Sequence, residues 1–193
     1  MKSLAELVLT EQDIRVLIEF RKEILKETID NGCDRIIPVI SALCYDAYVG
    51  NKKEMLFGIA IDFNTHEQKE IIMKSIARQC IKQRLIPIAV IMSCEGWMVK
   101  TNNIINVPPS QHPDKQEVVL IQLMTIDKRA YMITGVITRA KDNKIIVNKF
   151  DEDTKVQANL LSIVFAHFFE EMKLREESAE LPELPELPGI HLN

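Results

Sequence analysis

The chain has 193 residues, 47% of them hydrophobic and 27% charged, and its formal net charge is −4 at pH 7. These proportions are typical of one globular domain with a sizeable core. They provide no basic excess of the kind that marks nucleic-acid-binding proteins, so nucleic acid is not an expected partner. Because no run of about 18 uninterrupted apolar residues occurs, the sequence also predicts no membrane span.

Cysteine usage and the first residues of the chain favour a cytoplasmic location. Cys33, Cys44, Cys80 and Cys94 form no C-x-x-C pair, so free thiols in a reducing compartment are the simpler interpretation. The first residues lack the apolar segment of a signal peptide. The six glycines are widely scattered and form no phosphate-binding loop, and we expect neither a cofactor nor a metal.

The first predicted element is a helix over residues 11–30. Thr10 is typical of a helix N-cap, and Asp13, three residues later, completes a weak capping box. Apolar residues then recur at the three- and four-residue spacing of one helix face. Asn31-Gly32 supplies the stop, because both residue types adopt the left-handed conformation at low cost.

Two strands and a second helix are expected next. The strands are predicted over 37–46 and 55–63, and residues 51–54 are predicted to form the turn between them. Asn64 or Thr65 is the expected N-cap of the helix. The buried stripe of that helix is expected to consist of Ile72, Met73, Ile76, Ala77, Cys80 and Ile81.

The middle of the chain predicts the centre of a sheet. Residues 86–93 and 118–126 are apolar on both faces, as central strands are. Strands over 129–140 and 144–150 follow short turns. The sheet is therefore expected to end in a three-strand antiparallel meander.

A closing helix and an acidic tail are expected after the sheet. The helix is predicted to start at Asp153 or Thr154 and to end near Met172. Residues 176–193 repeat Glu-Leu-Pro three times, and proline every third residue blocks a helix, so this tail is expected to be extended or disordered. Residues 1–175 then form a single α+β domain, with a mixed or largely antiparallel sheet of about six strands and three helices.

Residues that carry chemistry gather between the two central strands. Glu95 and Trp97 follow the first of these strands, and the connection to the second contains His112, Asp114 and Glu117. Antiparallel pairing of the two strands would bring this connection back to Glu95. A carboxylate, an imidazole and an indole in one place suit a hydrolytic site, a metal site or a ligand pocket.

A structural interpretation of the same residues is favoured. His112-Pro113-Asp114 forms a turn readily, because proline fixes its own backbone and aspartate caps N–H groups. Glu95 can accept bonds from backbone or indole N–H groups and so fix the loop. The metal site is the weaker version, because Glu95 and His112 lie far apart in sequence and no close ligand pair accompanies them.

The same stretch resembles a loose group of small uncharacterised proteins from bacteria and their phages. Their shared pattern is S-x-E-x-W followed by P-S-x-H-P-D-(R/K)-x-E. Here it is matched by Ser93, Glu95, Trp97, Pro109, Ser110, His112, Pro113, Asp114, Lys115 and Glu117. Lys115 stands where arginine is expected, and Gly96 where alanine is expected. The resemblance implies a common fold and an important loop, and it brings no activity with it.

Three other patterns are weaker candidates. His66 begins a stretch similar to the zinc-protease pattern H-E-x-x-H, but Glu70 replaces the second histidine. Cys94 with His112 could form a nucleophile and its base, although a packed thiol is favoured. His167 lies in the apolar stripe of the closing helix, where a core histidine is the expected role.

Two functions from different classes remain. The favoured hypothesis is a non-enzymatic interaction or scaffold module that contacts an unknown protein through the 101–117 loop or through the tail, with a homo-oligomer left open. The tail offers Leu181, Leu184 and Leu187 on an extended backbone. The binding residues expected near the loop are Trp97, Ser110, Lys115 and Glu117.

The alternative is a hydrolase-like enzyme. In that hypothesis Glu95 is the general base or a ligand, His112 the acid or base, and Asp114 the residue that orients the imidazole. It requires the three side chains to meet at an open pocket within hydrogen-bond reach, directly or through one water.

Overall fold

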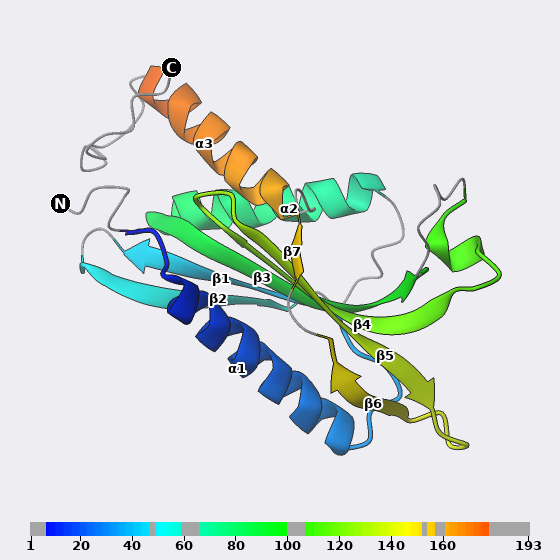
Figure 1. The fold of residues 1–193 in the computed structure, drawn as a ribbon. Helices are drawn as coiled ribbons and strands as arrows, with labels where there is room; N and C mark the ends of the chain where they lie inside the picture. The colour runs from blue at the N-terminus through cyan, green and yellow to red at the C-terminus, as the bar shows by residue number, and fades with distance from the viewer. Residues whose placement is uncertain are drawn as a thin grey trace.

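The computed structural model describes residues 7–46, 49–58, 66–99, 107–151, 154–156 and 161–177 (Figure 1). These residues contain three α-helices, seven strands and the short 3₁₀-helix η2. In chain order the elements are α1 (Glu11–Asp30), β1 (Val39–Asp46), β2 (Asn51–Gly58), α2 (His66–Lys82), β3 (Leu85–Met98), η2 (Pro109–Gln111), β4 (Gln116–Thr125), β5 (Ala130–Arg139), β6 (Ile145–Phe150), β7 (Thr154–Val156) and α3 (Ser162–Glu177).

The described strands form one sheet with the order β2-β1-β3-β4-β5-β6, and β7 pairs with β5 beside this path. Each of these pairings is antiparallel. Together with the three helices, this confirms the α+β fold class expected from the sequence. The predicted meander is also confirmed, because β4, β5 and β6 follow one another in the chain and in the sheet.

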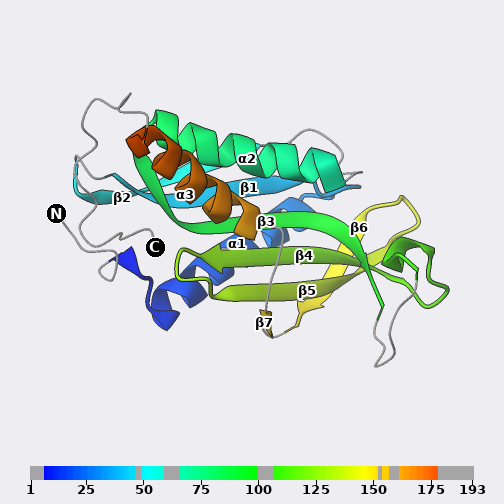
Figure 2. The same cartoon turned by 90° about the horizontal axis from the view of Figure 1, so that it is seen from above.

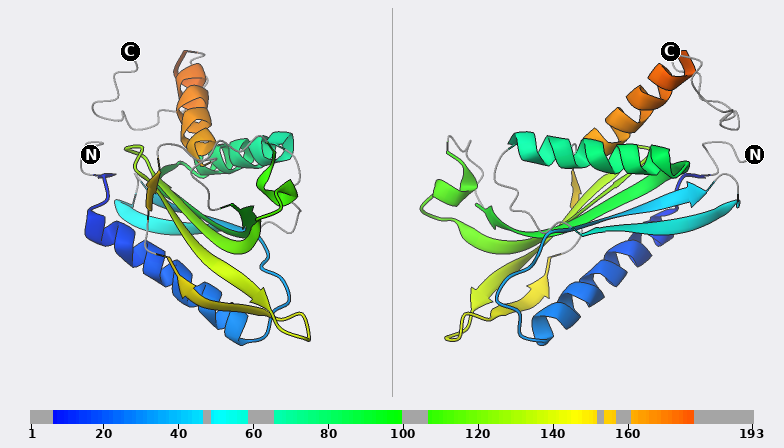
Figure 3. Two further views of the ribbon diagram at one scale, coloured as in Figure 1. Left: turned by 45° about the vertical axis from the view of Figure 1, so that its right-hand side comes forward. Right: turned by 180° about the vertical axis from the view of Figure 1, so that it is seen from behind.

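The helices cover both faces of the sheet. α1 crosses one face, while α2 and α3 lie on the other (Figures 1 and 3), and Figure 2 shows α2 and α3 in front of the strands with α1 behind them. Side-chain contacts agree: buried Arg21 of α1 donates to Ser41 of β1, whereas the sulfur of Cys44 on β1 lies 3.8 Å from that of Cys80 on α2. We call the two sides the α1 face and the α2 face.

The predicted helix over 11–30 is confirmed as α1. The Thr10 hydroxyl accepts the Asp13 N–H (3.1 Å), and the Asp13 carboxylate accepts the Thr10 N–H (2.9 Å), which completes the capping box. At the other end Gly32 alone takes the left-handed conformation, with φ of 81°, while Asn31 keeps φ of −72°. The predicted stripe of α2 is largely confirmed, because Ile72 is half-buried and the other five residues are buried.

The predicted turn at 51–54 is wrong. Asn51 begins β2 and pairs with Asp46 of β1, and the turn includes residues 49–50. Among the described strands β2 has a single neighbour, and an edge strand accommodates charged residues such as those of 51–54. β1 begins at Val39, two residues after the predicted start, and the expected strand residues 59–63 and cap residues 64–65 lie outside the described residues.

The predicted start of the closing helix is also wrong. Thr154 belongs to β7 and pairs with Met132 of β5, so its backbone serves the sheet and α3 begins only at Ser162. Asp153 lies outside the described residues, as does the tail from residue 178 onward. α3 continues past Met172 to Glu177. Among the described helices, none combines the length and the apolar character needed to cross a membrane.

Candidate functional site

The pairing of β3 with β4 determines where the candidate residues lie. β3 is longer than predicted and ends at Met98. Glu95 and Trp97 therefore belong to the C-terminal part of this strand, after the buried stretch that ends at Ser93. Trp97 pairs with Glu117 of β4, and the chain between the two strands returns through η2 to this end of the sheet. The predicted antiparallel pairing of the two central strands is therefore confirmed.

Arg139, at the end of β5, is the centre of the polar contacts there. Its Nε donates to Glu117 Oε2 (2.9 Å) and its Nη2 to Glu117 Oε1 (2.5 Å), which is a two-point ion pair. Nη2 also lies 3.3 Å from Glu95 Oε2. The three side chains are between 21% and 28% exposed, so the pair is only partly screened by water. The bonds to Glu117 and the neighbouring carboxylates raise the pKa of Arg139 above its ordinary value.

The same cluster holds the connection between α1 and β1. Glu95 Oε1 accepts the backbone N–H of Ile36 (2.5 Å), and Arg139 Nη1 donates to the carbonyl of Asp34 (2.7 Å). A further bond runs from Nη1 to the carbonyl of Asn143 (3.4 Å), in the turn between β5 and β6. Glu95 thus accepts a backbone N–H bond, as the structural interpretation predicted, but the bond fixes the α1–β1 connection and not the loop that follows β3. Sequence analysis missed Arg139, and the available signal was only a cation at the end of a predicted strand, because Glu117 and Glu95 are 22 and 44 residues away in the chain.

His112 and Asp114 bond to each other and to their own turn. The Asp114 N–H donates to His112 Nδ1 (3.1 Å), and the Asp114 carboxylate lies 4.0 Å from the same nitrogen. The Lys115 N–H donates to the His112 carbonyl (3.3 Å). Glu95 lies on β3, which pairs with the strand that follows this turn. Among the described residues, however, its carboxylate has no hydrogen bond or ion pair with His112 or Asp114. The structure therefore brings these residues to one end of the sheet in two separate groups.

Trp97 and Lys115 form an exposed pair beside η2. The Lys115 Nζ lies 4.7 Å from the centre of the Trp97 ring and donates to the Ser110 carbonyl (2.7 Å). A cation over an indole is attracted by the negative face of the ring. Trp97 is nevertheless 43% exposed. We call Trp97, Ser110 and Lys115 the loop surface, since Lys115 contacts both of the other two predicted binding residues.

The remaining candidates lie elsewhere. Cys94 alternates with Glu95 along β3 and so points to the α2 face, away from the Glu95 cluster. Its burial raises the pKa of the thiol to about 11, the opposite of the activation that a nucleophile needs. His167 is buried in α3 with Nε2 3.3 Å from Glu171, which also accepts from Arg78 Nε (3.2 Å). No metal-binding group of three His, Cys, Asp or Glu occurs among the residues that the structure describes.

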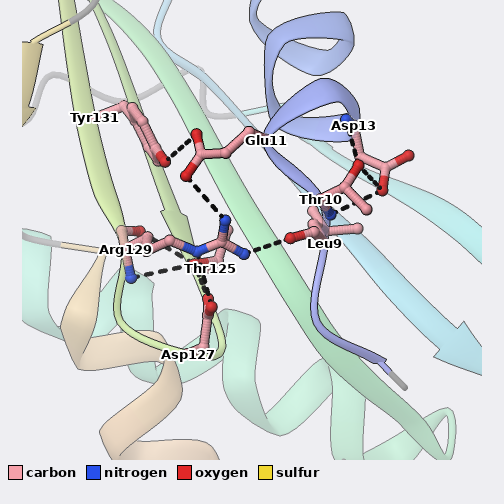
Figure 4. Close-up of polar contacts among 8 residues, drawn as sticks. All are labelled: Leu9, Thr10, Glu11, Asp13, Thr125, Asp127, Arg129 and Tyr131. Atoms are coloured by element: carbon pink, nitrogen blue, oxygen red, sulfur yellow. Dashed lines mark hydrogen bonds and ion pairs between the residues drawn. The ribbon is translucent and has the colours of Figure 1, made fainter. Parts of the chain in front are cut away.

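A second polar network, which sequence analysis also missed, joins the start of α1 to the turn between β4 and β5 (Figure 4). Arg129 donates through Nε to Asp127 Oδ2 (2.7 Å), through Nη1 to Glu11 Oε1 (3.3 Å), and through Nη2 to the Leu9 carbonyl. The Tyr131 hydroxyl donates to Glu11 Oε2 (2.9 Å). Burial and the bond to Glu11 raise the pKa of Tyr131. The two arginines thus attach α1 to the sheet at both ends.

Comparisons of this chain with protein-family models, with curated proteins and with solved structures found no match.

Proposed function

We propose that the protein is a non-enzymatic interaction module that contacts a protein partner through the loop surface. The observation that supports this proposal is a contrast at the end of β3 and β4: the carboxylates there are held in ion pairs, whereas the tryptophan beside them is exposed. Glu95 and Glu117 are engaged by Arg139, whereas Trp97 remains 43% exposed beneath the Lys115 ammonium. The proposal keeps the cytoplasmic location expected from the sequence.

The Arg139 cluster gives the loop surface a rigid base. Glu117 pairs with Trp97 across β3 and β4, and its carboxylate is fixed by two bonds to Arg139. Lys115 is fixed over Trp97 by its bond to the Ser110 carbonyl. Rigid aromatic groups lose little conformational freedom on binding, and exposed tryptophan is enriched among residues that dominate interface energies.

The chemistry of the loop surface selects the kind of partner segment. The indole offers a large apolar contact, and the Lys115 ammonium beside it favours a carboxylate. We therefore expect a partner segment that places an apolar side chain on Trp97 and an acidic side chain beside Lys115. The hydrolase-like alternative requires Glu95 to meet His112 and Asp114, whereas the Glu95 carboxylate bonds to the Ile36 N–H and to Arg139, and we do not propose it.

Site-specific photocrosslinking tests the proposal. A benzoylphenylalanine placed at position 97 is expected to crosslink one discrete partner in a lysate of the source cells. The same group at Ile71 of α2, which is 60% exposed, is the matched control on another surface. Excess unlabelled wild-type chain should compete for the crosslink, and an excess of the W97A/K115E double variant should not.

Two results would contradict the proposal. One is an identical crosslinked species from position 71 and position 97, since this would mean nonspecific capture. The other is a hydrolytic activity of the purified wild-type chain that both E95Q and H112A abolish while W97A retains it. The second result would restore the hydrolase-like alternative.

A further inference from the structure

The outward side of α1 carries a row of exposed apolar side chains. Its inward side buries Ile14, Ile18, Arg21, Leu25 and Ile29 against the sheet. On the outward side, Val16 is 58% exposed, Phe20 49% and Ile24 38%. Residues four apart are neighbours on a helix surface, so the three form one continuous row. In the figures, no other described element lies over this side of α1 (Figures 1 and 3).

A parallel row of carboxylates stands beside the apolar row. Glu19, Glu23 and Glu27 each follow one apolar residue of the row by three positions, which makes them its helix-surface neighbours. Glu19 is paired with Lys22 (2.7 Å), whereas Glu23 and Glu27 have no side-chain bond to any residue that the structure describes. Apart from buried Arg21, the cations of the helix are Arg15, Lys22 and Lys26, and they lie on the far side of the carboxylates from the apolar row, as 100° of rotation per residue requires.

The carboxylate row decides between the possible occupants. A second copy packed antiparallel about a two-fold axis would set the two carboxylate rows against each other. The chain's own tail over 178–193 contains three glutamates and no lysine or arginine, so the carboxylate row repels it. The row repels an anionic lipid surface for the same reason. A partner with apolar residues on one stripe and cations beside them complements both rows.

We propose that the outward face of α1 binds a basic amphipathic helix of another protein. Apolar residues of that helix at three- and four-residue spacing pack on Val16, Phe20 and Ile24, and its lysines or arginines meet Glu23 and Glu27. The three apolar residues span two turns of α1, so a partner helix of three to four turns covers the row. This face is separate from the loop surface and goes beyond the function proposed above.

Titration with a designed peptide tests the proposal on the full chain. The probe is a synthetic 18-residue helix with leucines at three- and four-residue spacing and lysines flanking them, and its matched control replaces the lysines with glutamates. Fluorescence anisotropy is expected to show binding of the lysine peptide only, weakened at high salt. F20E is expected to weaken this binding at least about tenfold, as the loss of a central apolar anchor does. E23K/E27K should weaken it similarly.

Control variants separate this proposal from the loop surface. I71E changes an apolar residue of comparable exposure on α2 and should leave peptide binding unchanged, as should W97A. Equal binding of the lysine and glutamate peptides, or full binding by F20E, would overturn the proposal. So would a wild-type dimer in analytical ultracentrifugation that F20E converts to a monomer, because the row would then bind a second copy.

Discussion

Arg139 and Glu117 lie on neighbouring strands and form a two-point ion pair, with Nε–Oε2 at 2.9 Å and Nη2–Oε1 at 2.5 Å. The planar guanidinium matches the carboxylate at both oxygens, which a lysine ammonium does not. Because Arg139 also contacts Glu95 and the Asp34 carbonyl, one side chain joins β3, β4 and the connection between α1 and β1 to the end of β5. Glu95, one of the residues expected to perform chemistry, thus lies within a structural contact.

R139M should destabilise the fold because it leaves Glu95 and Glu117 partly buried without their cation. We expect the free energy of unfolding, measured with urea, to fall by about 2 kcal/mol, between the values typical of exposed and of buried pairs. R139K keeps the charge but loses the two-point geometry, and about half of that cost should remain. K22M, which removes the exposed i,i+3 pair with Glu19, is the control and should change stability little. An R139M chain as stable as the wild type would contradict the role given to this arginine.

Asp13 should make the stability of α1 depend on pH. Its bonds from Thr10 lower the pKa of the carboxyl below the ordinary value of 3.8. A carboxyl whose pKa is lower in the folded state stabilises that state above the unfolded pKa, and the contribution disappears as the pH falls through the folded value. D13N should therefore be less stable than the wild type at pH 6, and the difference should shrink below pH 3.8. T10A should cost about 1 kcal/mol at pH 6 through loss of the cap. A D13N deficit that is constant down to pH 2.5 would rule out this linkage.

Cys94 should be unreactive in the folded protein. Burial raises the pKa of its thiol from 9.0 to about 11, so at pH 8 the thiolate fraction is very small. Alkylation with iodoacetamide at pH 8, followed by peptide mass spectrometry, should label Cys94 slowly when the chain is native and rapidly in urea. Fast native labelling at this position would mean that the thiol is activated and would reopen the nucleophile hypothesis.

The same thiol should lower stability at alkaline pH. Its pKa is raised in the folded state, so its contribution is fully present below pH 9 and is lost as the pH rises from 9 towards 11. The loss in the free energy of unfolding that this titration causes is on the order of 2 kcal/mol. Urea unfolding between pH 8 and pH 11 should show a steeper loss for the wild type than for C94A. Parallel curves for the two chains would show that Cys94 is not the group that titrates.

Two glycines of the sheet should differ in their tolerance of alanine. A Cβ at Gly135 would lie 2.7 Å from Val147 Cγ1, 3.0 Å from Phe150 Cδ1 and 3.1 Å from Val119 Cγ1. Rotating one of these side chains would not relieve the contacts with the other two. G135A should therefore lower the free energy of unfolding by about 1–3 kcal/mol.

Gly96 is the matched case, since the resemblance to other small proteins led to alanine being expected there. A Cβ would lie 2.7 Å from Leu120 Cδ1, the far end of one flexible side chain. Because Leu120 can move, G96A should cost less than about 1 kcal/mol. Urea unfolding of both variants measures the difference, and a G96A chain less stable than G135A would contradict the packing described.

Local patterns in the sequence predicted the elements that depend on short-range contacts. The bounds of α1 follow from the Thr10 capping box and the Gly32 stop, and both act within one helical turn. The apolar runs of β3 and β4 predicted two adjacent buried strands, because such runs are stable only when both faces are covered. The resulting register brought Trp97 to Glu117, as expected of antiparallel pairing.

Tertiary structure decided what depends on distant partners. The charged start of β2 and the short β7 exist because β1 and β5 offer them hydrogen bonds, which no local pattern records. The Arg139 cluster unites residues from four segments, and the Arg129 network joins α1 to a turn more than one hundred residues later. Local sequence patterns contain no information about a charged residue that is far away in the chain. In the folded chain that charge decides whether a carboxylate is available for chemistry or is held in a structural ion pair.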